Sequence, residues 1–142
     1  MITDREPVSV LGRDEAWNLL RGRTFGRLAV SVAGQPDVFP VNFRADENSI
    51  VFRSAPGDKL LGVTINSSVA FETDFYDTDE AWSVVVKGTA SVLDNHDEIF
   101  AAEHLGLRSW IPTSKPVFVR IVPAEVSGRR FQFGPEPEPE PY

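Results

Sequence analysis

Alternating apolar and polar residues recur along most of this chain and predict a succession of β-strands. A β-branched, alternating run covers residues 25–32, and the turn-forming sequence at 33–36 then breaks it. Runs at 37–44 and 49–54 complete a three-stranded meander. The same pattern returns in three later regions, at residues 68–75, 82–93 and 117–133. Pro123-Ala124 divides the last region into two predicted strands, 117–122 and 125–133. The chain therefore contains six or seven predicted strands.

Three segments show helical features instead. Residues 13–20 place Ala16, Leu19 and Leu20 at i, i+3 and i+4, with Trp17 at the rim of that face, where it can anchor the helix to a barrel. A short helix is expected from Gly57 to Asn66 with Asp58 as N-cap, and another from 97 to 106.

The predicted elements indicate a mainly β (α+β) fold. Six or seven antiparallel strands with short flanking helices are typical of a small barrel, here a split β-barrel. The run at 82–93 is long for a strand, and Gly88 near its middle predicts a bulge or strong bend of the kind that closed barrels require.

Composition narrows the possible functions. The 142 residues fit one domain, 1–133, followed by a Pro-Glu tail at 134–142 that we expect to be disordered. The net charge of −7 argues against nucleic acid as a partner. The chain has no cysteine and two histidines, which argues against a metal site, and no apolar run is long enough for a membrane span. We expect a cytoplasmic protein.

The turn from Phe52 to Leu60 has the composition of a phosphate-binding site. It offers the cations Arg53 and Lys59, the hydroxyl of Ser54, and backbone N–H groups at the start of a predicted helix. Such short motifs also occur by chance, so a plain turn carrying solvated surface charges is the alternative. Glu72 and Asp74 alternate on a predicted strand and share a face, where an exposed position is favoured over a hydrolytic carboxylate pair.

Several motifs in their order resemble the pyridoxamine 5′-phosphate oxidase-like flavoproteins, in particular the short branch that includes the nitroimidazole reductases. The resemblance covers about residues 8–133. It is carried chiefly by Gly26-Arg-Leu-Ala-Val, Pro36-Asp-Val-Phe-Pro-Val-Asn-Phe43, Val51-Phe-Arg-Ser-Ala-x-Gly-x-Lys-Leu60, Val69-Ala-Phe-Glu-Thr-Asp74 and Trp82-Ser-Val-Val-Val-Lys-Gly-Thr-Ala90.

This resemblance implies a homodimeric split barrel that binds FMN at sites shared by both subunits. It assigns the strand at 40–43 to the flavin ring, the turn at 52–60 to the ribityl chain and phosphate, and the start of the 82–93 strand to the vicinity of the flavin. Trp110 and Arg129 are candidates for contacts contributed by the second subunit. The implied cofactor-binding residues are Val41, Asn42, Phe43, Arg53, Ser54, Lys59, Leu60, Trp82, Ser83, Trp110 and Arg129.

Two departures from the family pattern limit what the resemblance implies about activity. The chain lacks the Arg- and His-bearing terminal segment of true pyridoxamine 5′-phosphate oxidases, so we do not expect that reaction. Arg53 stands where many nitroimidazole-reductase relatives have histidine, and an arginine cannot act as an acid or base at neutral pH. Arg53 could instead bind an anionic substrate or stabilise negative charge on the reduced flavin. No catalytic residue is assigned.

The leading hypothesis is therefore an FMN-dependent oxidoreductase acting on a small molecule. A deazaflavin (F420)-dependent reductase on the same fold is the closest alternative. A flavin-binding or storage protein without turnover, and a cofactor-free barrel with an interaction role, are the other two classes left open.

Overall fold

Seven antiparallel strands and three short helices make up the computed structural model, which describes residues 6–64, 67–111 and 113–139. In chain order the elements are β1 (Val8–Leu11), α1 (Arg13–Arg21), β2 (Phe25–Val32), β3 (Gln35–Ala45), β4 (Ile50–Ser54), α2 (Lys59–Thr64), β5 (Ser67–Tyr76), β6 (Glu80–Val92), α3 (His96–Glu103) and β7 (Val117–Gln132). The prediction of a mainly β fold with short flanking helices is confirmed.

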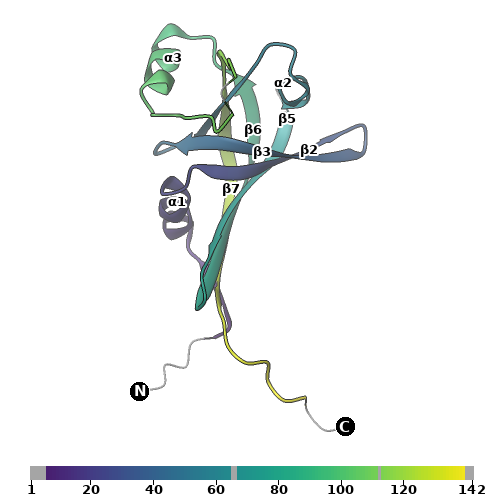
Figure 1. The fold of residues 1–142 in the computed structure, drawn as a ribbon, viewed down its shortest axis with the longest axis vertical. Coiled ribbons are helices and arrows are strands. Elements are labelled where there is room, and N and C mark those ends of the chain that lie inside the picture. Colours follow the sequence, from purple (N-terminus) through teal and green to yellow (C-terminus); the bar gives the residue numbers. More distant parts are fainter. Residues whose placement is uncertain (1–5, 65–66, 112, 140–142) are drawn as a thin grey trace.

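The strands form one sheet that closes on itself. Their order is β1-β7-β4-β3-β2-β5-β6, and β6 also pairs with β7, so six strands form a ring and β1 lies outside it. The strands β6 and β7 run side by side well beyond the ring (Figure 1). Strand β1 was not predicted. It has four residues, of which three are exposed, and it pairs with the distant β7.

The two predicted C-terminal strands are a single strand, β7, because β6 pairs with both halves of it. The ladder shifts register between Lys87 and Gly88, opposite Pro123, and this irregularity accommodates a residue that has no N–H to donate. The irregularity predicted at Gly88 is found there, but the extra residue, Ala124, belongs to the partner strand β7. A Cβ atom at this position would lie far inside van der Waals contact of the Val122 carbonyl oxygen, so the close approach of β6 and β7 requires glycine.

The core fills the ring with large apolar side chains from its strands. Phe43 and Phe71 meet edge to face inside it, with ring centroids 4.6 Å apart. The helix α1 packs through Ala16 and Leu20, and the indole N–H of Trp17 donates a hydrogen bond to the Asp46 carbonyl at 2.9 Å. The predicted anchoring role of Trp17 is thereby confirmed.

A smaller apolar cluster holds α3 against the other side of β4 and β7. It consists of Val51, Leu93, Ala102 and Phe118. The side chain of Asn95 caps the helix by accepting hydrogen bonds from the next turn. Leu105 and Leu107, which follow α3, also pack against this cluster, so the start of the connection to β7 is held in place. Among the helices in the described residues, none combines the length and apolar character needed to cross a membrane.

Candidate functional site

A cleft of about 330 Å³ opens between β3, the end of β4 and the connection from α3 to β7. Its wall is mainly apolar. The lining residues are Phe25, Pro40, Val41, Asn42, Arg53, Asp58, Leu60, Leu107, Arg108, Ser109, Trp110, Ile111 and Lys115. Five of the eleven residues implied by the family resemblance are brought together here: Val41, Asn42, Arg53, Leu60 and Trp110.

An aromatic pair and an amide form one wall of this cleft. Phe25 and Asn42 lie opposite each other in the β2–β3 ladder. Trp110 stacks on Phe25 with ring centroids 4.5 Å apart and planes 12° from parallel, and its backbone N–H donates to Asn42 Oδ1 at 3.0 Å. The Asn42 Nδ2 atom is buried and has no hydrogen-bond partner in the described structure. The wall therefore offers a flat aromatic surface beside an unused donor.

Three cations lie along this cleft. The Arg53 Nε–H donates to the Lys115 carbonyl at 2.8 Å, and Lys115 Nζ donates to Ser109 Oγ at 3.2 Å. Arg108 is the third cation. Among the described lining residues, Asp58 is the one carboxylate, and its Oδ1 accepts the Leu60 N–H at 3.1 Å, next to the start of α2. The cleft is thus locally positive in a chain of net charge −7, which suits an anionic group on a flat ligand.

The predicted phosphate residues Ser54 and Lys59 lie outside this lining. Adjacent residues of a strand point to opposite faces, and here Arg53 lines the cleft while the Ser54 side chain is buried. The Ser54 hydroxyl has no hydrogen-bond partner in the described residues. Lys59 is 73% exposed and its Nζ pairs with Asp37 Oδ2 at 3.1 Å. Their assignment to a phosphate stays a prediction.

The four remaining predicted residues lie elsewhere in the sheet. Phe43 is in the core, and Trp82 is buried and stacks on Phe75 with centroids 6.3 Å apart. Ser83 and Arg129 face each other across the β6–β7 ladder. None of the four is among the described residues lining the cleft.

The sequence interpretation missed Phe25, Arg108 and Lys115 as site residues. Phe25 is the first residue of β2, and alternation along that strand gives no reason to single it out. Arg108 and Lys115 lie in the irregular connection between α3 and β7, where no periodic pattern places a side chain. The available signal was modest: two basic residues close to Trp110 in a chain that is acidic overall.

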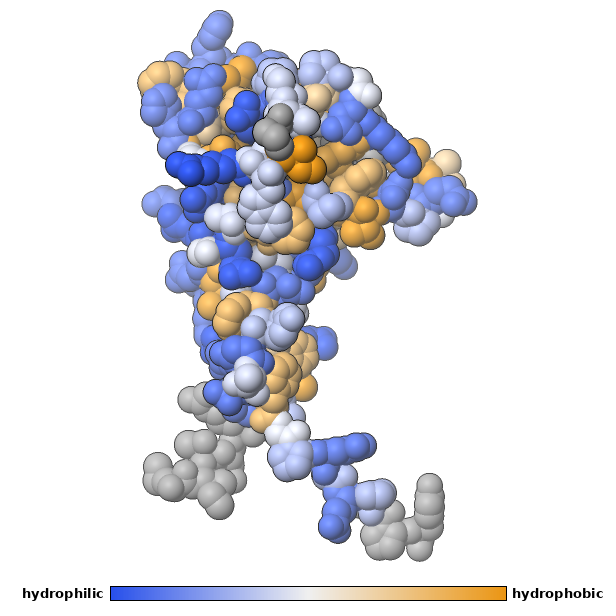
Figure 2. Space-filling model, in the orientation of Figure 1, coloured by the Kyte–Doolittle hydropathy of each residue, from blue (hydrophilic) through white to orange (hydrophobic). Residues whose placement is uncertain are grey.

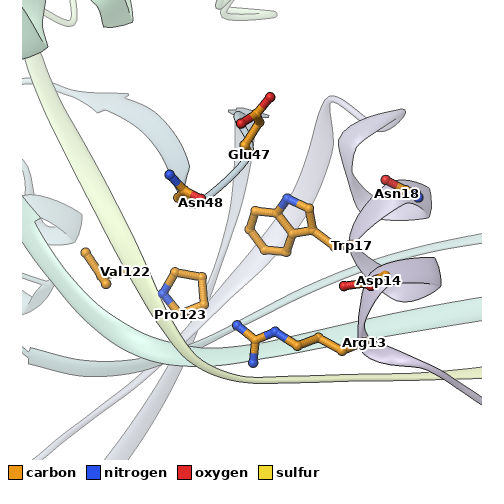
Figure 3. A pocket seen from close by; sticks show the side chains of 8 residues that line it. All are labelled: Arg13, Asp14, Trp17, Asn18, Glu47, Asn48, Val122 and Pro123. Carbon is orange, nitrogen blue, oxygen red and sulfur yellow. The ribbon is translucent and has the colours of Figure 1, made fainter.

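A larger hollow of about 630 Å³ lies beside α1 but has different chemistry. It is bounded by α1, the β3–β4 turn and the bend of β7, and Trp17 projects into it toward Asn48 and Pro123 (Figure 3). Its charged lining residues are Arg13, Asp14 and Glu47, so both signs are present. The described lining of this larger hollow includes none of the predicted site residues, and its charges are of both signs. We therefore regard the smaller cleft as the candidate site.

An ion cluster occupies the outer face of β2 and β5. Arg27 Nη1 lies 3.1 Å from Glu72 Oε2 and 3.4 Å from Asp74 Oδ1, so the two carboxylates share a face as predicted. Both side chains are partly exposed and both contact the arginine, which fits an exposed strand face. Burial, followed by the neighbouring Asp74 carboxyl, raises the pKa of Glu72 to about 7 from its ordinary 4.5, although Arg27 acts in the opposite direction.

This shift predicts a pH dependence of stability. Because the folded state binds a proton that the unfolded state releases, the stabilisation is complete below pH 4.5 and is lost as pH rises through about 7. We expect Glu72→Gln to flatten the fall in unfolding free energy between these values, as measured by urea denaturation. The control Asp77→Asn should leave that slope unchanged, since hydrogen bonds from backbone N–H groups lower the pKa of Asp77 from 3.8. An unaltered slope in Glu72→Gln would exclude Glu72 as its source.

Comparison with known proteins places the chain in a family. The family profile described as pyridoxamine 5′-phosphate oxidase matches residues 12–130, and the chain belongs to this family. The resemblance inferred from the sequence motifs is confirmed.

Solved structures of related proteins share the fold over nearly their whole length. A protein of unknown function from Corynebacterium diphtheriae is 42% identical, with a TM-score of 0.76 over 89% of this chain and 99% of that one. An FAD-binding protein from Mycobacterium smegmatis is 34% identical, with a TM-score of 0.80 over 88% and 99%. An FAD-binding protein from Mesorhizobium loti is 28% identical, with a TM-score of 0.74 over 87% and 96%. The fold of this chain is thus one found in flavin-binding proteins.

Proposed function

We propose that this chain binds a flavin in the cleft between β3, β4 and the described residues 107–111 and Lys115, and acts as a flavin-dependent oxidoreductase on a small molecule. The observation that carries the proposal is the combination of a flat aromatic wall with three cations in one cleft. A flavin has a flat ring with apolar faces, polar atoms along an edge and an anionic tail. The relatives from M. smegmatis and M. loti, described as FAD-binding, support this ligand class. FMN, the cofactor implied by the family resemblance, has the same flavin ring as FAD and the same phosphate next to the ribityl chain.

The residues present fit such a group. The buried, unpartnered Nδ2 of Asn42 is a donor suited to the polar edge of the ring, and Trp110 would cover one of its faces. Arg53 and Lys115 would hold the phosphate through charge-assisted hydrogen bonds. A bound flavin supplies the electron-transfer chemistry, while the protein binds and orients it.

The cleft contributes little acid–base chemistry of its own. Histidine, tyrosine and cysteine are absent from the described lining residues, and the Asp58 carboxylate already accepts a hydrogen bond from the α2 backbone. We therefore propose that any proton consumed in turnover comes from solvent or from a second subunit.

A second copy of the chain is the partner that we propose to complete the site. Trp110 and Ile111 in the cleft wall are 67% and 61% exposed, and Val38 on β3 is 60% exposed. Apolar surface is visible beside the β2–β3 hairpin (Figure 2). Exposed apolar side chains of this size near a ligand site are typical of an interface, and self-association is the commonest way to cover them.

Size-exclusion chromatography with simultaneous visible absorbance tests both parts of the proposal. The full chain, purified and incubated with FMN or FAD, should elute at the size of a dimer and carry the two visible bands of an oxidised flavin. Dilution below the dimer dissociation constant should release the flavin. A single visible band in the protein as purified would indicate a deazaflavin, and no band after incubation would favour the cofactor-free barrel. Bound flavin that no nicotinamide or quinone can reduce or oxidise would indicate a binding protein without turnover.

A further inference from the structure

The side chain of Asn42 has a fixed orientation in the wall of the candidate cleft. The Trp110 backbone N–H, a group that can only donate, lies 3.0 Å from Asn42 Oδ1. The amide oxygen must therefore face Trp110, and the amide nitrogen must point away from it. This contact joins β3 to the connection between α3 and β7, so the fold of the chain, and not the sequence around Asn42, sets the orientation.

The amide nitrogen so oriented is a buried donor in need of an acceptor. Asn42 lines the cleft, and its Nδ2 atom is buried without a hydrogen-bond partner among the described residues. Most buried donors in proteins are paired. An unpaired donor in the wall of a ligand cleft therefore indicates that an atom of the ligand accepts a hydrogen bond from it.

The wall as a whole favours negative charge on its ligand. Three cations share the described lining with Asn42, and Asp58 is the one carboxylate there. A neutral donor such as Nδ2 binds an acceptor more strongly when the acceptor carries negative charge, because a charge-assisted hydrogen bond is about twice as strong as a neutral one. Of two states of one ligand, the more negative state is thus bound more tightly.

We propose that Asn42, oriented by the Trp110 backbone N–H, makes a bound flavin easier to reduce. The inference rests on the proposed function, because it requires the flavin ring in this cleft. A hydride from a reduced nicotinamide breaks one C–H bond of the donor and forms one bond to the ring. The nicotinamide is oxidised, and the ring gains two electrons, one hydrogen and one negative charge. Asn42 Nδ2 binds this anion more tightly than the oxidised ring, and the difference raises the reduction potential.

Potentiometric titration of the FMN-loaded full chain with dithionite tests this role. The potential of FMN bound to the wild type should lie above that of free FMN. Asn42→Leu removes the donor and keeps a side chain of similar size. Asn42→Asp keeps an acceptor for the Trp110 N–H and places an oxygen where the donor was. The potential should fall in Asn42→Leu and fall further in Asn42→Asp, where a tenfold to hundredfold loss of preference for reduced FMN corresponds to about 30–60 mV for two electrons.

The pH dependence of the potential is a readout that a merely structural role would not move. Near neutral pH the wild-type potential should fall by about 30 mV per pH unit, the value for one proton taken up with two electrons. In Asn42→Asp the slope should approach about 60 mV per pH unit, since a second proton neutralises the ring. Asn18→Asp is the matched control for the added charge. Asn18 is exposed on α1 and lines the larger hollow instead of the cleft, so both quantities should stay at their wild-type values.

The outcomes separate this role from the proposed function. A wild-type potential at or below that of free FMN would overturn the role of Asn42 without any variant and leave flavin binding standing. Equal potentials in the wild type, Asn42→Leu and Asn42→Asp would do the same. Failure of FMN to bind the wild type would overturn both the inference and the proposed function.

Discussion

Replacing Lys115 by alanine should weaken FMN binding about ten- to a hundredfold and leave riboflavin binding nearly unchanged. Lys115 Nζ lies in the candidate cleft, where its hydrogen-bond partner in the described structure is the neutral Ser109 hydroxyl at 3.2 Å. Its positive charge is therefore not compensated by a carboxylate within the cleft wall. Because only FMN presents a phosphate, the difference between the two ligands isolates the contribution of that charge.

Lys59→Ala is the matched control for this experiment. Lys59 is largely exposed and its Nζ already pairs with Asp37 at 3.1 Å, so we expect a smaller loss of FMN affinity there. Titration of both variants with both ligands, followed by flavin fluorescence, gives the four affinities needed. If Lys59→Ala has the larger effect, the phosphate lies at the turn from Phe52 to Leu60, as the sequence motif suggested. Equal losses for FMN and riboflavin in Lys115→Ala would remove Lys115 from phosphate binding.

The parts of the fold that depend on neighbouring residues were predictable from the sequence. Alternation placed β2 at its observed bounds, and the single glycine in a long strand pattern identified the irregular point of the β6–β7 ladder. The short β1 and the continuity of β7 were not predictable, because both depend on pairing between residues far apart in the chain. A proline normally ends a strand, and only the irregular ladder opposite Pro123 explains why it does not do so here.

Some residues of the candidate site could likewise be predicted from the sequence and others could not. Asn42 and Arg53 were found because they lie on strands whose motif could be matched as a unit. Ser54 was assigned to the phosphate through the same matched motif, and because adjacent residues on a strand point to opposite faces, its side chain is buried while Arg53 lines the cleft; its role stays a prediction. Lys115 and Trp110 belong to the irregular connection between α3 and β7, and contacts with distant residues such as Arg53 and Asn42 bring them to the cleft.

Gly88→Ala should lower the free energy of unfolding by about 3 kcal/mol, the upper part of the range for overpacking, and the melting temperature by about 10 °C. The added Cβ atom would collide with the backbone carbonyl of Val122, so no side-chain rearrangement on β7 can relieve the clash. Gly22→Ala is the control, since its Cβ atom would meet only the Leu19 carbonyl at an ordinary 3.6 Å and its φ is −80°.

Gly88→Ala should also lower flavin affinity, although Gly88 does not line the candidate cleft. Gly88 lies where β6 and β7 bend together, and the first residues of β7 pair with β4, which carries Arg53. Because β4 pairs with β7 on one side and with β3 on the other, forcing β6 and β7 apart should reduce flavin affinity together with stability. Thermal unfolding followed by circular dichroism, with flavin titration below the melting temperature, measures both quantities. A variant with wild-type stability would show that the strands approach less closely in solution than this packing requires, whereas lost stability with unchanged flavin affinity would show that ring closure does not govern the cleft.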